Sequence, residues 1–423
     1  MTINVQLKDN PNQPQIDAFI GLPTLMQLAV SGEDLAPMGR QLLERLQANP
    51  SDANAMMDLS IVMQLRGQLD VALPMQAEAL QIQQVYHLPT SVEPPTVRLL
   101  AIVTTGELMA NTPLEFLVQG SQVSLDLLYV GPDTPPPTSL PEHDLLFIAV
   151  GESDRTQPLL TELANGITPW CCPVLNQPAN IARLSRDGAC ALLGTLPGID
   201  LPNTARIDRR RLTAVGQGEV SISRIIGDGD FPLIVRPVDS QAGRGLSKLD
   251  GPADIVAYLN AQPDAEFYVA RFVDYRGQDG LFRKYRIVFI DGRPFVAHMA
   301  VSEHWMIHYL NAGMGEDDAK REEEARFMAT FDEDFAHRHA PALSAMVDRV
   351  GLDYFGIDCA ETPQGDLLIF EVDSALVVHA MDSIETYPYK RPQMEKIFAA
   401  FQRMLVQRMN QSQPSEERGH GNC

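Results

Sequence analysis

Three continuous apolar runs constrain the fold of this chain most. They are VRLLAIVTT at residues 97–105, SLDLLYV at 124–130 and DLLFIAV at 144–150. Strands of a parallel sheet are covered on both faces, so they appear as unbroken apolar runs rather than as alternating ones. Helix-like segments at 112–120 and 155–167 accompany them, and CPVLN at 172–176 adds a further strand. We predict a Rossmann-like α/β layer over residues 91–180, without the GxGxxG motif that would support a dinucleotide site.

The segment before this layer has the pattern of paired helices. Its spaced positions are Met56, Leu59, Ser60 and Met63, then Gly67, then Ala72 and Ala79. Small residues let paired helices approach closely, and the pattern resembles one tetratricopeptide repeat, although a stable array needs about three. We predict a helical, tetratricopeptide-like module over residues 1–90, with a proline-rich joint at 87–96. It is either a hairpin packed on the main body or an element that docks a protein or peptide partner or a second copy.

Composition excludes several classes of function. The chain has 423 residues and a net charge of −22, which argues against nonspecific binding of nucleic acid or of an anionic membrane, because both need positive surface. Its five cysteines form no CxxC pair, so neither a disulfide framework nor a zinc site is expected. No apolar run is long enough for a membrane span, and the N-terminus is polar. We therefore predict a reduced, cytoplasmic protein.

A glycine-containing loop follows a predicted strand at residues 231–245, FPLIVRPVDSQAGRG. Arg236 stands near the end of the strand, and Gly243 and Gly245 lie in the loop. Glycine lets backbone N–H groups turn toward an anion without obstruction by a Cβ atom, and arginines such as Arg236 and Arg244 form charge-assisted bonds to phosphate. A phosphate site and a simple mobile hairpin turn are both compatible with this pattern.

The next hairpin is indicated by Asp291-Gly292 between two apolar runs, which favours a type I′ turn. A two-residue turn places Tyr285 opposite His298 and Arg286 opposite Ala297. In this acidic chain the segment carries a basic cluster, formed by Arg271, Arg276, Arg283, Lys284 and Arg286. The cluster is either a pocket for phosphates or substrate carboxylates, or a solvated strand face.

A second hairpin, at residues 353–374, carries three carboxylates. Glu371 and Asp373 are two residues apart on a strand and therefore project to the same side. The TPQG turn before that strand gives a register with Asp358 opposite Ile369, on the same face. Three carboxylates then converge, as magnesium ligands do, while calcium binding or pairing with Arg or Lys remain alternatives.

In this order, the elements from about residue 97 to 407 resemble the ATP-grasp superfamily, in particular its branch with glutathione synthetase and ribosomal-protein glutamate ligase. The matching stretches are VLNQPANIARLSRDGACALLGTLPGIDLPNT, LIVRPVDSQAGRG, FYVARFVD, RKYRIVFIDGRPFVAHMA and FGIDCAE…LLIFEVDS. The resemblance implies an α+β ATP-grasp domain over residues 181–408, after the Rossmann-like pre-ATP-grasp domain. A disordered tail is expected over 409–423.

The resemblance also implies a site for ATP and Mg²⁺, with Mn²⁺ as an alternative. Metal ligands would be Asp358, Glu371 and Asp373. Nucleotide contacts would be Arg236, Ser240, Gly243, Arg244, Gly245, Arg271, Phe272, Val273 and Asn311, and Arg286 and Lys284 would be catalytic. Four positions depart from the family pattern: Arg236 for a lysine, Gly188 for a second lysine, Asp373 for an asparagine, and SALVVHAMD after it for a glycine-bearing turn that contacts substrate.

The implied function is that of an ATP-dependent carboxylate–amine ligase, acting through an acyl phosphate on a small amino acid or peptide. Alternatives are a kinase of this fold that phosphorylates a hydroxyl, and a scaffold with a vestigial nucleotide site. A homodimer is left open. His304, Trp305 and His308 are expected either in the core or in the substrate pocket, and His379 and Asp382 are candidate substrate contacts.

Overall fold

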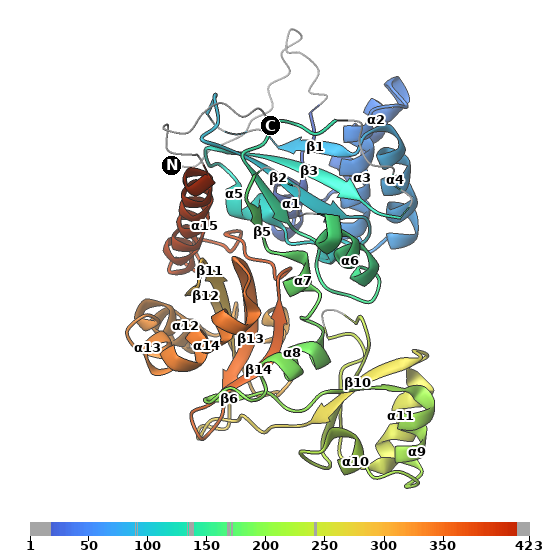
Figure 1. Cartoon of the computed structure of the whole chain (residues 1–423), viewed down its shortest axis with the longest axis vertical. Coiled ribbons are helices and arrows are strands. Elements are labelled where there is room, and N and C mark those ends of the chain that lie inside the picture. The colour runs from blue at the N-terminus through green and yellow to red at the C-terminus, as the bar shows by residue number, and fades with distance from the viewer. Residues whose placement is uncertain are drawn as a thin grey trace.

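The computed structural model describes residues 18–88, 90, 92–132, 134, 139–166, 170, 172–240 and 243–412. Three sheets organise this part of the chain, and Figure 1 shows them stacked along the long axis. The upper sheet is called here the first sheet, the lower one the lid sheet, and the one between them the central sheet.

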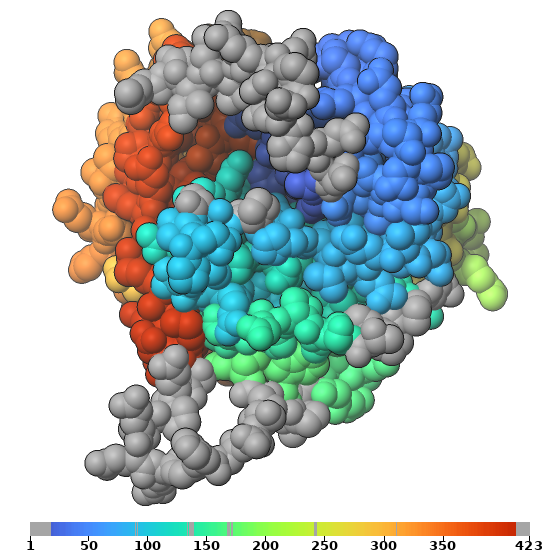
Figure 2. Space-filling model, turned by 90° about the horizontal axis from the view of Figure 1, so that it is seen from above, coloured from blue at the N-terminus to red at the C-terminus, as the bar shows by residue number. Residues whose placement is uncertain are grey.

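The N-terminal helices are α1 (Leu22–Val30), α2 (Ala36–Ala48), α3 (Ala53–Leu65) and α4 (Leu69–Ile82). The side chain of Asp52 caps α3 by accepting a hydrogen bond from the N–H of Ala55, and Gly67 takes the positive φ of 74° that the turn between α3 and α4 requires. Figure 2 shows these helices beside the first sheet, on the side away from α15 (Lys390–Ser412).

The first sheet has the order β1-β3-β2-β4-β5. Its strands are β1 (Val85–Leu88), β2 (Val97–Thr104), β3 (Val123–Val130), β4 (Leu145–Ile148) and β5 (Val174–Leu175), with η1 (Leu108–Ala110), α5 (Leu114–Val118) and α6 (Gln157–Gly166) between them. The parallel pairing of β2 with β3 and β4, and of β4 with β5, confirms the strands predicted from the apolar runs. The edge strand β1 was not predicted. It pairs antiparallel with β3, so the sheet begins before the boundary expected at residue 90.

The lid sheet has the order β7-β10-β8-β9. Its elements are β7 (Ala205–Asp208), β8 (Leu233–Pro237), β9 (Ser247–Leu249) and β10 (Glu266–Arg271), with α9 (Arg209–Gly216), α10 (Ser223–Ile226) and α11 (Pro252–Ala261). A small core of its own, which includes Leu212, Val235 and Phe267, lies between the sheet and these helices.

The central sheet has the order β12-β11-β13-β14-β6. Its strands are β6 (Ile199–Asp200), β11 (Phe282–Ile290), β12 (Arg293–Ser302), β13 (Tyr354–Glu361) and β14 (Leu367–Asp373). The elements around it are α7 (Pro178–Ile181), α8 (Arg186–Leu193), η2 (Tyr309–Asn311), α12 (Asp318–Thr330), α13 (Phe335–Arg338), α14 (Ala340–Val350) and α15. Helix α15 contacts both β12 and β2, and so joins the central sheet to the first one.

Two expectations about helix ends were wrong. Residues 179–196 form two helices rather than one, because the side chain of Ser185 accepts a hydrogen bond from the N–H of Gly188 and starts α8 there. Helix α15 continues to Ser412, so the first residues of the expected tail are helical. The remainder of the predicted tail, 413–423, lies outside the described residues.

Both hairpins form, but both predicted registers were wrong. The Asp291-Gly292 turn joins Ile290 to Arg293 as expected, whereas a bulge after Arg286 places Arg286 opposite His298. Tyr285 consequently faces Met299. In the second hairpin Glu361 pairs with Leu367, one residue off the predicted register, and a bulge after Asp358 adds a second residue, so Asp358 lies opposite Glu371 rather than Ile369. A bulge adds one residue to one strand and re-aims the side chains beside it, and no residue pattern here announced either one.

The main hydrophobic core is continuous from the N-terminal helices to the central sheet. It includes Leu59 of α3, Leu99 of β2, Ile357 of β13 and Phe401 of α15. The helices are thus packed on the main body, as the first of the two roles considered for them requires. No helix in the described part of the chain has the length and apolarity to cross a membrane.

Candidate active site

A cavity of about 930 Å³ lies between the lid sheet and the central sheet, and the segments at the carboxyl ends of the first sheet also reach it. Its walls include most of the residues predicted for the site, namely Arg236, Ser240, Gly243, Arg271, Phe272, Val273, Lys284, Arg286, Asn311, Asp358, Glu371 and Asp373. Arg244 and Gly245 do not line it: Arg244 is exposed and pairs with Asp264 at 3.6 Å. A Cβ on Gly245 would lie 2.6 Å from Pro237, so this glycine permits a close approach within the lid.

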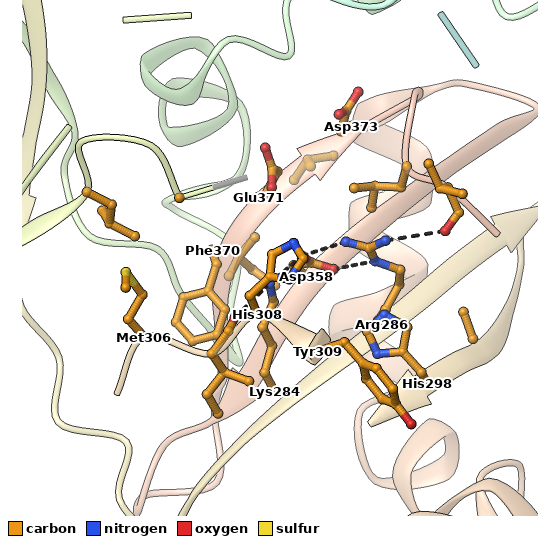
Figure 3. A pocket seen from close by; sticks show the side chains of 18 of the residues that line it. Lys284, Arg286, His298, Met306, His308, Tyr309, Asp358, Phe370, Glu371 and Asp373 are labelled. Atoms are coloured by element: carbon orange, nitrogen blue, oxygen red, sulfur yellow. Dashed lines mark hydrogen bonds and ion pairs between the residues drawn. The ribbon is translucent and has the colours of Figure 1, made fainter. Parts of the chain in front are cut away.

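Asp358 is the most buried charge in the cavity wall and is held by two cations (Figure 3). Arg286 donates to both of its carboxylate oxygens at 2.8 and 3.0 Å, and Lys284 Nζ lies 2.6 Å from Oδ2. Burial alone would raise the pKa of Asp358, but the charges of Arg286 and Lys284 outweigh it and hold that pKa well below its usual range. The trio carries one net positive charge and faces the cavity.

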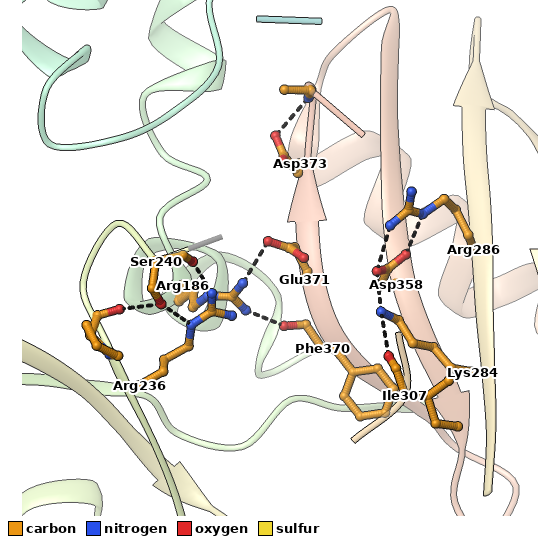
Figure 4. A network of polar contacts seen from close by, with 12 residues as sticks. Arg186, Arg236, Ser240, Lys284, Arg286, Ile307, Asp358, Phe370, Glu371 and Asp373 are labelled. Atoms are coloured by element: carbon orange, nitrogen blue, oxygen red, sulfur yellow. Dashed lines mark hydrogen bonds and ion pairs between the residues drawn. The ribbon is translucent and has the colours of Figure 1, made fainter. Parts of the chain in front are cut away.

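Glu371 and Asp373 stand apart from Asp358 (Figure 4). Arg186 donates to Glu371 at 2.7 Å and to the carbonyl of Phe370 at 2.8 Å, and Asp373 accepts from the N–H of Ala375 at 2.8 Å. Burial, with the charge of Glu371 in addition, raises the pKa of Asp373 to about 6. The convergence of three carboxylates was therefore wrong. Arg286 and Lys284 of β11 bind the carboxylate of Asp358, and no group of three His, Cys, Asp or Glu able to hold a metal occurs among the described residues.

The two remaining carboxylates still fit a divalent cation. Glu371 and Asp373 project from the same strand into one cavity and have Arg186 as their one ion-pair partner among the described residues. Magnesium is commonly bound through one or two carboxylates, with phosphate oxygens and water completing its shell. Asp358 instead matches the alternative considered from the sequence, pairing with Arg and Lys.

Arg236 is a buried cation without a carboxylate partner in the described part of the chain. Only 8% of it is exposed, and it donates to the side chain of Ser240 at 3.0 Å and to the Ser240 carbonyl. Burial, and then the neighbouring Arg186, lowers the pKa of Arg236 to about 10. A guanidinium in this position gains most from a bound anion, because burial of an unpaired charge is costly.

Arg186 was missed from the sequence. It is the first residue of α8. Gly188, two residues later, stands where the sequence resemblance predicts a lysine. A Cβ on Gly188 would lie 2.5 Å from the carbonyl of Arg183 and 2.7 Å from Ser185 Oγ, so the start of α8 leaves no room for a longer side chain. Arg186 supplies a cation to the same region from the first position of α8. The usable signal was the pair of an N-cap serine and a basic residue after it.

The predicted basic cluster is divided by the fold. Arg283 pairs with Asp279 and Glu323, and Arg276 lies 5.1 Å from the ring centre of Phe282, so neither lines the cavity. The side chain of Arg271 pairs with Asp200 and Asp228. Beside it the ring of Phe272 packs edge-on against Trp305 at 5.7 Å and forms an aromatic wall.

A second polar group in the cavity wall combines the predicted Asp382 with Lys390, which was missed from the sequence. Lys390 is buried and lies 3.4 Å from Asp382, and its Nζ is 3.9 and 4.4 Å from the ring centres of Tyr309 and Tyr387. The fully buried Glu324 accepts from the hydroxyls of Tyr309 and Tyr389. Its pKa is raised by burial. No motif around Lys390 or Glu324 marked either residue.

The remaining candidates are placed as follows. Trp305, His308, His379 and Asp382 line the cavity, whereas His304 does not. The side chain of Asn311 accepts from the N–H of His308 at 2.9 Å and caps η2, so its observed contact is a structural one.

The lid contacts a loop of the first sheet at Asp154. Arg206 on β7 donates twice to Asp154, at 2.7 and 2.5 Å, and the N–H of Asp154 donates to the carboxylate of Asp239. Arg206 also donates to Glu266 on the neighbouring lid strand. The pair Arg206–Asp154 is called the lid contact below.

No family model and no curated protein matches this chain. Among solved structures, VanG D-Ala:D-Ser ligase from Enterococcus faecalis is 15% identical with a TM-score of 0.44, over 73% of this chain and 99% of its own. A RimK domain ATP-grasp protein from Sphaerobacter thermophilus is 14% identical, TM-score 0.41, over 74% and 99%. D-alanine–D-alanine ligase from Bacillus anthracis complexed with ATP is 11% identical, TM-score 0.43, over 74% and 99%. The function is therefore inferred from this chain's own residues.

Proposed function

We propose that this protein is an ATP-dependent carboxylate–amine ligase of the ATP-grasp kind. The observation that carries the proposal is the distribution of charge in one cavity. Arg236 is a buried cation that lacks a carboxylate among the described residues. In the same cavity Glu371 pairs with Arg186, and Asp373 has no ion pair within the described part of the chain. A nucleotide with its divalent cation complements both groups. The phosphate supplies an anion for Arg236, and the divalent cation supplies positive charge for Glu371 and Asp373.

Each wall of the cavity has a part in this proposal. Arg236 and the loop after it hold phosphate oxygens, with Arg186 beside them, and Phe272, Val273 and Trp305 flank the base. Glu371 and Asp373 hold Mg²⁺ or Mn²⁺. When bound, that ion neutralises charge on the transferred phosphoryl group. Lys284 and Arg286 orient the substrate carboxylate and stabilise the negative charge that it passes to the acyl phosphate.

The reaction needs no nucleophile from the protein. A substrate carboxylate oxygen attacks the γ-phosphorus of ATP, the bond to ADP breaks, and an acyl phosphate forms. An amine then attacks the acyl carbon, the carbon–oxygen bond to phosphate breaks, and inorganic phosphate leaves as the amine loses a proton. The products are an amide, ADP and phosphate.

Asp358 is not placed to act as the base of a kinase. A kinase would need a carboxylate free to accept the hydroxyl proton. Asp358 is held by Arg286 and Lys284, and its pKa is well below the usual range, so it is a poor proton acceptor. The net positive charge of the trio suits an anionic substrate instead.

The decisive measurement is the product balance of the purified protein with MgATP and pooled amino acids and peptides. A ligase gives ADP and free phosphate in equal amounts, together with a new amide-linked mass. A kinase would give ADP with a stable phosphorylated product and no free phosphate. Absence of MgATP binding in calorimetry would contradict both the ligase and the kinase. The remaining candidate would then be a scaffold with a vestigial nucleotide site.

The metal assignment has its own test. Glu371→Gln should raise the Mg²⁺ concentration needed for half-maximal activity by about tenfold or more, since it removes one anionic ligand. Glu316→Gln, which alters another carboxylate of the cavity wall, is the control. Equal Mg²⁺ dependence in both variants would remove Glu371 from the metal site.

A further inference from the structure

The N-terminal helices hold a loop of the first sheet in place. Two buried glutamines, Gln64 of α3 and Gln76 of α4, bind the backbone of residues 106–108. Gln76 accepts from the N–H of Gly106 at 2.8 Å and donates to its carbonyl at 3.2 Å, while Gln64 accepts from the N–H of Leu108 at 3.0 Å. The loop that leads into η1 is therefore fixed by the helical hairpin rather than by the sheet alone.

The same loop packs on the segment that follows Asp373. A Cβ added to Gly151 would lie 3.1 Å from the carbonyl of Ala110 and 3.2 Å from the side chain of Ala375, so these three residues are in close contact. Thr112 donates to the carbonyl of Ser374 at 2.9 Å. Residues 374–379 stand where the sequence resemblance predicts a glycine-bearing substrate turn, and here they contact Thr112 and, through His379, Phe116 of α5.

The helices also contribute side chains to the cavity itself. Met26 and Val30, one turn apart on α1, line it together with Met109 of η1. Helix α1 contacts α5 (Figure 1). Val30 is 54% exposed and Met109 42% exposed, although both are apolar. These three residues are called the apolar wall. Exposed apolar surface that faces a binding cavity gains free energy when an apolar group covers it.

We propose that the apolar wall is the specificity element of the ligase and that it takes the apolar side chain of an amino acid, free or at the end of a peptide. The proposal rests on the proposed function for the identity of the reacting groups. The charged ends of the substrate lie toward the Lys284–Arg286–Asp358 trio and the Asp382–Lys390 pair, and the side chain lies against Met26, Val30 and Met109. Methionines are flexible and polarizable, so the wall adapts to apolar side chains of different shape.

The test compares L-phenylalanine with glycine, which share an ammonium and a carboxylate and differ in the side chain. Calorimetric titration of the full chain with MgADP present should show phenylalanine binding at least about tenfold more tightly than glycine. Val30→Asp and Met109→Asp should each abolish this difference by weakening the binding of phenylalanine. Val71→Asp on α4, where Val71 is 46% exposed and lies outside the cavity lining, is the matched control and should preserve it.

Equal binding of the two amino acids, binding of neither, or an unchanged preference in Val30→Asp and Met109→Asp would overturn the inference. Both side chains are exposed, so their replacement should leave the free energy of unfolding nearly unchanged, and the unfolding curve of each variant checks this. Phenylalanine binding without ADP formation from any substrate pair would uphold the wall and refute the ligase. Amide formation confined to glycine and other small substrates would uphold the ligase and refute the role of the apolar wall.

Discussion

Arg286 and Asp358 occupy directly opposed positions on β11 and β13 and are joined by two hydrogen bonds, of 2.8 and 3.0 Å. Only 2% of Asp358 is exposed, and Lys284 approaches the same carboxylate from the next position but one on β11. Two cations of the cavity are therefore bound to one anion. Removing that anion should lower the free energy of unfolding, which can be measured.

Asp358→Asn should destabilise the fold by about 3–5 kcal/mol, because it leaves two poorly solvated cations without their anion. Urea unfolding followed by circular dichroism measures the loss. Asp366→Asn changes an exposed aspartate in the turn before β14 and serves as the control, with an expected change within about 0.5 kcal/mol. A loss below about 1 kcal/mol for Asp358→Asn would contradict the role given to the trio.

Arg236→Ala should weaken MgATP binding by about tenfold to a hundredfold, since hydrogen bonds to charged groups contribute about 1.5–3 kcal/mol. Arg244→Ala is the informative comparison. The sequence pattern places both arginines at the phosphates, whereas the structure turns Arg244 out to solvent beside Asp264. Calorimetry should show near-normal affinity for Arg244→Ala, and equal losses in the two variants would restore the sequence-based assignment.

Asp154→Asn removes the lid contact and should raise the KM for ATP by up to about fivefold, as expected for a partly exposed ion pair. Glu266→Gln removes the other partner of Arg206, but that partner lies within the lid itself. The KM for ATP should therefore remain normal in Glu266→Gln. If both variants change the KM for ATP to the same extent, Asp154 serves only to orient Arg206 and does not hold the lid against the first sheet.

Asp58 on α3 should give the N-terminal helices a pH-dependent stability. Burial raises its pKa to about 7, although the N–H groups of Ile20 and Gly21 bond to it and oppose that rise. An unfolded aspartate titrates near about 3.9, so between pH 4 and 7 the folded chain binds more protons than the unfolded one. The free energy of unfolding then falls as pH rises through this range, by up to about 1.4 kcal/mol per pH unit.

The variant Asp58→Asn isolates this effect, because other titrating groups cancel in the difference between the two proteins. The difference in unfolding free energy between wild type and Asp58→Asn should change steadily from pH 4.5 to 6.5 and level off above pH 7.5. A difference that is independent of pH would show that Asp58 titrates near its ordinary pKa.

The sequence predicted which strands form better than it predicted how the strands pair in register. The apolar runs identified β2, β3 and β4, because burial on both faces leaves a strong composition signal. The edge strand β1 is short and only Tyr86 of its four residues is buried, so it left no such signal. The two bulges shifted the pairing of Arg286 and Asp358, since a bulge depends on packing across the sheet rather than on a local motif.

The site was predicted as a set of positions but not as a set of contacts. Arg236, Glu371 and Asp373 line one cavity as expected, and their binding roles stay predictions. Asp358 was expected beside a metal but is paired with two cations. These cations come from β11, and the strand register decides which residues of β11 lie next to Asp358. Lys390 was missed because an isolated basic residue carries no pattern, and Arg186 because its position after the N-cap Ser185 was not used as a signal. The peptide partner of the helices, a homodimer and a cytoplasmic location likewise stay predictions.

The separate core of the lid has a consequence for how the chain melts. Leu212, Val235 and Phe267 pack only with one another and their lid neighbours, whereas the remaining core is shared from α1 to α15. Two cores of this kind behave as two cooperative units, so a calorimetric scan of the free protein should resolve a smaller and a larger endotherm. A ligand clasped between them ties the two units together. The scan would then collapse toward a single peak, and this thermal signature would report occupancy of the cavity without any knowledge of the reaction.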